Sequence, residues 1–323
     1  FMNIKDKLIR KWDSTKFAPA WQIARNYSTS ISNNYFFNDE DKLDAIVQVT
    51  LNDVISFSKY WLFNSSRIEA LIYGNIHQTK AINNLLNLKT ILGIRDLNKD
   101  RDIDKHKLKI NSGEQLLYLN QTNTNNSCMW KTYQIGDGSA QSRALALIIG
   151  NIIKTPFYTD MRTKQQLGYI VWGGGYGIKS YSGLYFIIQS GDYSPDYLDI
   201  QSNQFINSLP SLIMNMPKEV FEKIKTATIE NIKEKPTNIY EKGSKFYSLI
   251  FDYQRDFNRD TKTINFINSL DIHSLHDFVL KTFDKQKTRN ITTLIFSNDH
   301  EYNELLVPSI KDIDLWKKNR IYN

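Results

Sequence analysis

The chain has 323 residues, of which 41% are hydrophobic and 23% charged, and this composition excludes a disordered or fibrous protein. Its net charge of +7 does not indicate nucleic-acid binding, because Lys and Arg are interleaved with Asp and Glu along the whole length and do not form a cluster. The single cysteine, Cys128, excludes an intrachain disulfide and a cysteine-based zinc site, and no run of about twenty apolar residues predicts a membrane-spanning helix.

The predicted elements begin with a helix at the start of the chain whose apolar pattern returns later. The apolar residues at helical spacing are Phe1, Ile4, Leu8, Ile9 and Trp12, matched about 220 positions later by Phe221, Ile224, Ile229 and Ile232. A second predicted helix within 46–57 is matched within 267–278, with Thr50 and Asp271 as N-cap candidates. Each copy then ends in a predicted strand, at 67–74 and at 289–296.

A period near 220 residues has the size of a domain and not of a solenoid unit. The alternative is chance similarity, because Phe, Ile and Lys are frequent in this chain. The repeat predicts that residues 1–93 are the C-terminal part of one domain and that residues 113–323 are a complete second copy. Between the copies, residues 95–105 are highly charged without an apolar period, which predicts a linker over 94–112.

The complete copy is predicted to begin with strands at 115–119 and 129–135. Ser139 is expected to cap a helix whose core-facing residues are Leu145, Ile148, Ile149, Ile152 and Ile153. Further strands are predicted at 169–172 and 184–189, joined by a loop that opens with Gly173–Gly177, where the glycines would supply positive φ for a hairpin. Helices and a strand at 292–296 follow, and this order predicts an α+β fold in which an antiparallel sheet has helices packed on one face.

Several kinds of catalytic site are missing from the sequence. Neither a G-x-S-x-G nucleophile motif nor a G-x-x-x-x-G-K-[ST] phosphate loop occurs, and Gly173–Gly177 leads towards a strand without a helix N-terminus that could hold phosphate. The nearest approach to an H-x-x-E-H zinc motif is His273 and His276, which lack the adjacent Glu and are interpreted as a surface or helix-start pair. His77, His106 and His300 are isolated, so no metal site is expected in this chain.

The most informative segment runs from Pro156 to Val171 and contains Arg162-Thr163-Lys164-Gln165-Gln166-Leu167-Gly168-Tyr169. It resembles the R-x-x-x-Q-L-G-Y segment in the C-terminal half of insulin-degrading-enzyme-like metallopeptidases, the pitrilysin family. The segments at 183–190 and 69–76 also resemble strands of that family, and weaker similarity extends in order over nearly the whole chain.

The resemblance implies an architecture of four homologous α+β domains in two bowl-like halves that enclose a peptide chamber. The N-terminal half of such an enzyme holds the catalytic zinc, and nothing in this chain corresponds to that half. The C-terminal half lends an Arg and a Tyr to the substrate, and these correspond to Arg162 and Tyr169.

The chemistry of these two side chains suits such a role. A guanidinium can donate to a peptide carbonyl or carboxylate, and a phenol can stabilise a developing oxyanion. The competing interpretation is that Arg162 pairs with a surface acid and that Tyr169 packs in the sheet. Gly168 is expected to break the preceding helix, Gln165, Gln166 and Leu167 to fix the turn, and Phe157, Tyr158 and Tyr185 are weaker candidates for a substrate surface.

The function predicted from the sequence is therefore that of the substrate-binding, non-zinc-binding half of a zinc metalloendopeptidase, inactive by itself. Its expected partners are the zinc-binding N-terminal half and a peptide substrate. The alternative is a non-catalytic scaffold or partner subunit of the same fold. The two differ in whether an H-x-x-E-H half accompanies this chain.

Overall fold

The computed structural model describes residues 1–62, 68–93, 107–178, 181–253, 255–302 and 305–322. They form two compact units, each assembled from segments far apart in the sequence. One unit contains the described residues of Phe1–Asp13, Asp39–Lys105 and Lys235–Arg255, and the other contains those of Ser14–Asn38, His106–Glu234 and Asp256–Asn323. These units cut across the predicted domain limits of 1–93, 94–112 and 113–323, which remain a prediction about the sequence repeat.

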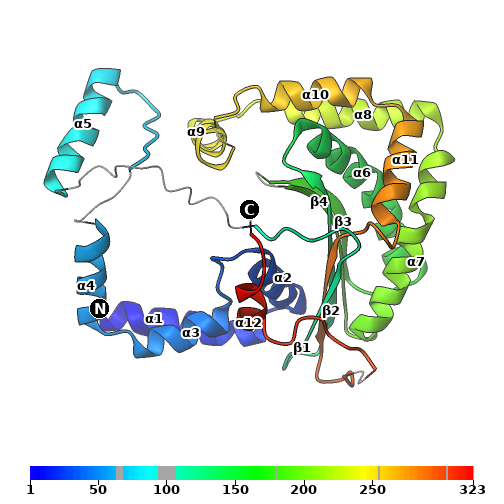
Figure 1. Cartoon of the computed structure of the whole chain (residues 1–323), viewed down its shortest axis with the longest axis horizontal. Helices are drawn as coiled ribbons and strands as arrows, with labels where there is room; N and C mark the ends of the chain where they lie inside the picture. Colours follow the sequence, from blue (N-terminus) through cyan, green and yellow to red (C-terminus); the bar gives the residue numbers. More distant parts are fainter. Residues whose placement is uncertain (63–67, 94–106, 179–180, 254, 303–304, 323) are drawn as a thin grey trace. The chain divides into compact units, whose positions relative to one another are not determined.

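Within the described residues, the second unit is built on a sheet of five strands in the order β1-β5-β2-β4-β3 (Figure 1). The strands are β1 (Gln115–Gln121), β2 (Ser127–Asp137), β3 (Ile170–Gly177), β4 (Tyr181–Ser190) and β5 (Asn290–Phe296). β1 pairs with β5 in parallel, and the other neighbours are antiparallel. All seven residues of the interior strand β5 are buried, as expected of a strand covered on both faces.

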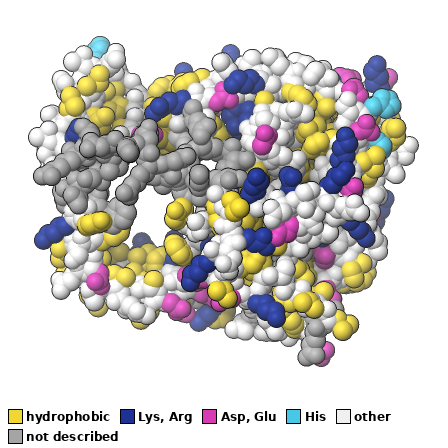
Figure 2. All heavy atoms as spheres, viewed as in Figure 1, with side chains coloured by type: hydrophobic (Ala, Val, Ile, Leu, Met, Phe, Trp, Pro, Cys, Tyr) yellow, Lys and Arg dark blue, Asp and Glu magenta, His cyan; other side chains and the backbone are white. Residues whose placement is uncertain are grey.

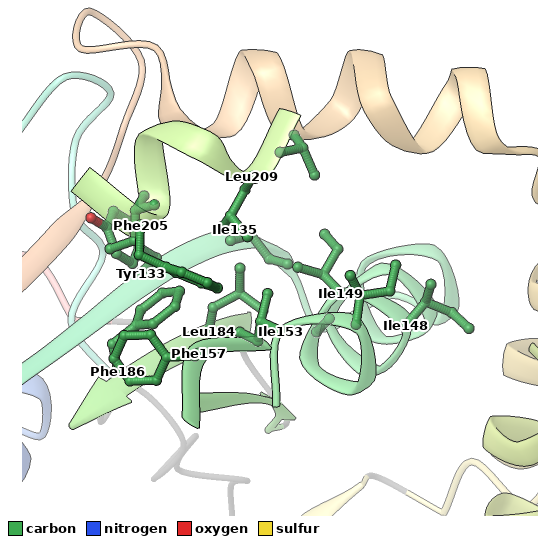
Figure 3. Close-up of a cluster of buried hydrophobic side chains, with 14 of the residues drawn as sticks. Tyr133, Ile135, Ile148, Ile149, Ile153, Phe157, Leu184, Phe186, Phe205 and Leu209 are labelled. Carbon is green, nitrogen blue, oxygen red and sulfur yellow. The ribbon is translucent and has the colours of Figure 1, made fainter. Parts of the chain in front are cut away.

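One face of the sheet is covered by helices α6 (Ala140–Tyr158) and α7 (Pro195–Met214), against which α8 (Lys218–Lys233), α10 (Arg259–Ser269) and α11 (Ile272–Phe283) pack. Ser139 caps α6 by accepting a hydrogen bond from the Ser142 amide, as predicted. The predicted core-facing residues of α6 are all buried, and Figure 3 shows Ile148, Ile149 and Ile153 in the core cluster. In the same cluster, the Phe157 ring lies 5.1 Å between centroids from both Phe186 and Phe205.

The opposite face of the sheet is covered by α2 (Ala20–Ser32), with α12 (Ile313–Lys318) beside it. Ala20 and Ala24 are fully buried, and such small side chains let a helix approach a sheet closely. The α+β fold class is thus confirmed, but two predicted details are wrong. The sheet includes a parallel pair, and helices cover both of its faces.

The glycine-rich segment Gly173–Gly177 is part of strand β3 and not a loop with positive φ, so that prediction is wrong. Its glycines are required by the close approach of α6. A Cβ on Gly175 would lie 1.8 Å from the Ala146 oxygen, and a Cβ on Gly150 of α6 would lie 2.3 Å from the Gly175 nitrogen.

The first unit is helical. It contains α1 (Met2–Asp13), α3 (Asp39–Gln48), α4 (Leu51–Leu62), α5 (Gln78–Ile91) and α9 (Ile239–Tyr247), which continues into the π-helical turn η3 (Ser248–Asp252). The predicted strand at 67–74 is not formed over its described residues, 68–74. A strand needs neighbours for its backbone hydrogen bonds, and the described residues of this unit include no other strand.

The predicted repeat is visible in the order of the helices. α1, α2, α3 and α4 are followed about 220 positions later by α8, α9, α10 and α11 in the same order. Burial differs between the copies. In the second copy Phe221 is 2% exposed and Leu275 is fully buried. In the first copy the matching Phe1 and Val54 are 40% and 45% exposed. The first copy therefore has the helices of the repeat, while its described residues lack the sheet that covers them in the second.

No helix within the described ranges is long and apolar enough to cross a membrane.

Candidate functional site

Arg162 and Tyr169 lie on the segment that connects helix α6 to the edge strand β3. After Tyr158 the helix widens into the π-helical turn η2 (Thr159–Lys164). The amide of Gln165 donates to the Asp160 oxygen at 3.0 Å, and that of Leu167 donates to the Met161 oxygen at 2.8 Å. Such π-helical turns occur frequently at functional sites.

Apolar residues anchor one side of this segment in the core. Phe157 and Met161 are fully buried, and Leu167 is 2% exposed. Because three side chains spaced along the segment are fixed in this way, the residues between them have a defined position on the surface.

The residue that ends the helix differs from the prediction. Gln166 has a φ of 55°, in the left-handed region, and Gly168 does not have a positive φ. Gly168 is needed for a different reason, since a Cβ there would lie 2.1 Å from the Gln189 oxygen on strand β4. The assignment of Gln166 and Leu167 to the turn agrees with the structure.

The guanidinium of Arg162 brings the two ends of the segment together. Its Nη1 donates a hydrogen bond of 2.7 Å to the backbone oxygen of Tyr169. Its carbon Cζ also lies 4.5 Å from the centroid of the Tyr169 ring and 5.2 Å from that of Tyr158, within the range of cation–π interactions. Tyr158, a weaker candidate in the sequence, thus joins the site, whereas Phe157 belongs to the core.

The exposure of these side chains disagrees with the packing interpretation. Tyr169 precedes the first residue of β3 and is 78% exposed, and Tyr158 is 40% exposed. Among the described residues, no carboxylate forms an ion pair with Arg162. The guanidinium is partly exposed, and one of its five N–H donors is hydrogen-bonded to the Tyr169 backbone oxygen. The other N–H donors can therefore bind a ligand.

The histidines do not assemble into a metal centre in the part of the chain that the structure describes. His273 and His276 lie at the start of α11, where Nδ1 of His276 is 3.5 Å from the Asp277 carboxylate. His300 contacts the hydroxyls of Ser127 and Ser297, and His106 lies outside the described residues. The described residues contain no group of three or more His, Cys, Asp and Glu side chains that could hold a metal ion.

Cys128 is not a candidate nucleophile. Its side chain is fully buried, and burial raises the pKa of the thiol well above its usual range. The reactive thiolate is therefore disfavoured at neutral pH.

Comparison with known proteins gives the site its context. A family described as PQQ synthase PqqF-like, C-terminal lobe domain 4, matches residues 148–247, which include Arg162 and Tyr169. The chain is 24% identical to the insulin-degrading enzyme of Drosophila melanogaster, over 93% of this chain and 31% of that protein. It is 25% identical to the A-factor-processing enzyme of Saccharomyces cerevisiae, over 86% of this chain and 27% of that protein. This chain is related to the C-terminal half of the insulin-degrading-enzyme-like metallopeptidases.

Solved structures show the pitrilysin-like fold. The crystal structure of pitrilysin matches with a TM-score of 0.87 at 19% identity, over 99% of this chain and 34% of that one. The peptidase M16 inactive domain from Pseudomonas fluorescens matches with a TM-score of 0.59 at 11% identity, over 90% of this chain and 69% of that one. The chain spans about a third or less of the length of the curated insulin-degrading-enzyme-like relatives named above.

The charged side chains on the visible surface of the sheet-containing unit are of mixed sign (Figure 2). On the face shown in Figure 2, Lys and Arg side chains over this unit are scattered among Asp and Glu side chains and form no single basic patch. A phosphate-binding surface would require them to converge.

Proposed function

We propose that this chain is the substrate-binding, non-zinc-binding C-terminal half of a zinc metalloendopeptidase that degrades peptides in an enclosed chamber. The observation that carries the proposal is the pair formed by the partly exposed Arg162 and the exposed Tyr169, held together by a hydrogen bond and a cation–π contact on a turn anchored in the core. The relationship to insulin-degrading-enzyme-like proteins supports it.

In this role Arg162 binds the peptide with the N–H donors that Tyr169 does not use. A planar guanidinium matches a backbone carbonyl or a carboxylate, and its contact with substrate exists before the reaction begins. Arg162 therefore contributes to substrate affinity as well as to turnover.

Tyr169 acts through its hydroxyl, which is directed by the stacked guanidinium and can donate a hydrogen bond. A donor placed where negative charge develops on the scissile carbonyl stabilises the transition state more than the ground state. Zinc in the N-terminal half would supply Lewis-acid chemistry and an activated water, whereas the described residues of this chain offer no comparable ligand cluster.

The test compares this chain, its N-terminal half and the two combined. The chain alone is expected to bind no stoichiometric zinc by elemental analysis and to hydrolyse no internally quenched peptide. The combination is expected to hold zinc and to cleave the peptide much faster than the N-terminal half alone. One zinc per chain in the isolated chain, or full activity of the N-terminal half without it, contradicts the proposal. Association without any gain in hydrolysis would instead support the scaffold alternative.

A further inference from the structure

A cavity of about 410 Å³ lies in the second unit, on the face of the sheet that α7 covers. Its lining comes from strands β1, β2 and β5, from α7, from Phe283 at the end of α11, and from Lys285 and Thr288 in the segment that follows. The volume falls within the range of small-molecule sites, roughly 300–1,000 Å³.

The floor of the cavity consists of two neighbouring rungs of the sheet, each a row of residues paired across strands β1, β5 and β2. In one rung Gln115 pairs with Asn290 and Asn290 with Tyr133. In the other, Thr292 lies between Leu117 and Lys131. The next rung on the same face is apolar, with Leu119, Leu294 and Met129 in the core cluster. Polar side chains are therefore concentrated on this part of a face that is otherwise apolar core.

Lys131 places a charged group inside this cavity. The residue is 4% exposed, and its Nζ lies 2.6 Å from both the Asp199 carboxylate and the amide oxygen of Asn203 on α7. Asn203 in turn donates to Asp199 at 3.0 Å. An ammonium has three N–H donors, so this network leaves one for a further acceptor.

A second donor in the lining has no partner. Thr288 is 5% exposed, and its Oγ1 makes no hydrogen bond with any described residue. A buried hydroxyl without a partner is unfavourable unless water or a ligand satisfies it. Lys285 is exposed and lines the same cavity, so two lysines are opposed by the single carboxylate of Asp199.

We propose that this cavity is a binding site for a small carboxylate-bearing molecule, which accepts hydrogen bonds from Lys131 and Thr288 and pairs with Lys285 at the rim. The excess of one positive charge favours an anion, and a volume of about 410 Å³ suits a small molecule. The site is separate from the proposed peptide contacts, since its floor is β1, β5 and β2, whereas Arg162 and Tyr169 precede β3 at the far edge of the sheet.

The experiment uses the full chain with succinate as the probe and succinamide, its neutral diamide, as the matched control. Backbone amide shifts of Thr288 and Asn290 are followed by NMR. Succinate is expected to shift these amides in a saturable manner, and succinamide is not. The Thr288→Val variant should weaken succinate binding about tenfold or more, because a hydrogen bond to a charged acceptor is lost.

Thr288→Val also provides a check on folding, because the substitution keeps the side-chain shape and removes an unpartnered hydroxyl. It should leave the ligand-free chain at least as stable. Lys285→Gln should weaken succinate binding, whereas Lys287→Gln, an exposed lysine outside the lining, should not. Equal shifts with succinate and succinamide, equal effects of the two lysine variants, or the absence of a saturable shift would overturn the proposal without touching the proposed peptidase role.

Discussion

Arg162 and Tyr169 are joined twice, by a 2.7 Å hydrogen bond from the guanidinium to the tyrosine backbone and by the stacking of the same guanidinium on the tyrosine ring. They lie seven positions apart in sequence, and the π-helical turn η2 and the left-handed Gln166 bring them together. The arginine thus fixes both the start of β3 and the direction of an exposed ring.

The first prediction is that Tyr169→Phe lowers kcat of the complete enzyme. Removing one preorganised donor to an oxyanion typically costs about 10²–10³ in turnover. Phenylalanine keeps the ring on which Arg162 stacks, and position 169 is 78% exposed, so thermal unfolding should be unchanged. Tyr240→Phe, at an equally exposed tyrosine, serves as the control for steady-state kinetics. Unchanged turnover in Tyr169→Phe would contradict the assigned role.

The second prediction is that Arg162→Ala raises KM and lowers kcat, because the guanidinium binds substrate in the ground state and also positions Tyr169. Combining it with Tyr169→Phe should lower kcat/KM by less than the product of the single effects, since the two residues act as a unit. Arg162→Lys should rescue little, because an ammonium lacks the planar fork that stacks on both tyrosines. Lys164→Ala, two residues away and exposed, is the matched control. Strictly multiplicative effects would show that the observed contact is not used.

The sequence predicts well those features that depend on local pattern. The Ser139 cap, the apolar face of α6 and the strands β1, β2, β4 and β5 each have a periodicity or a capping residue that identifies them. Arg162 and Tyr169 were found by resemblance. Their mutual contact could not be predicted, because it depends on the hydrogen bonds of a π-helical turn, which leave no periodic signal.

Features that depend on what packs against an element were predicted wrongly. The glycines at 173–177 predict a hairpin loop with positive φ, but their cause is the close approach of the α6 backbone to β3, which no local sequence pattern records. The helix α2 has buried residues at helical spacing, Ala20, Ala24 and Ile31, yet nothing in that pattern identifies the sheet face that it covers.

The third prediction tests the cause of the glycine-rich strand. Gly175→Ala should lower the free energy of unfolding by about 1–3 kcal/mol, as expected for overpacking, because the new methyl group would lie 1.8 Å from the Ala146 oxygen. Gly191→Ala, where the nearest atom would lie at 3.5 Å, should change it by less than about 0.5 kcal/mol. Urea unfolding of both variants measures the difference. A Gly175→Ala variant as stable as Gly191→Ala would mean that the helix can move away from the strand at little cost.

The fourth prediction uses the repeat to ask whether the first copy lacks its covering sheet. Leu275 and Val54 occupy matching positions, but Leu275 is fully buried and Val54 is 45% exposed. Leu275→Asp should cost more than about 4 kcal/mol and abolish cooperative unfolding of the isolated chain, because it buries an unpaired charge. Val54→Asp should change the stability of the isolated chain by less than about 0.5 kcal/mol, and its position in the first turn of α4 suits an acidic residue.

The two variants are then compared in the complete enzyme by thermal unfolding. If residues outside this chain supply a sheet that covers α4, Val54→Asp becomes strongly destabilising there, while Val54→Leu, which keeps an apolar side chain, does not. Equal tolerance of Val54→Asp in the isolated chain and in the complete enzyme would show that this face stays exposed to solvent. The apolar positions of the first copy would then have lost the packing role that their counterparts at Phe221 and Leu275 keep.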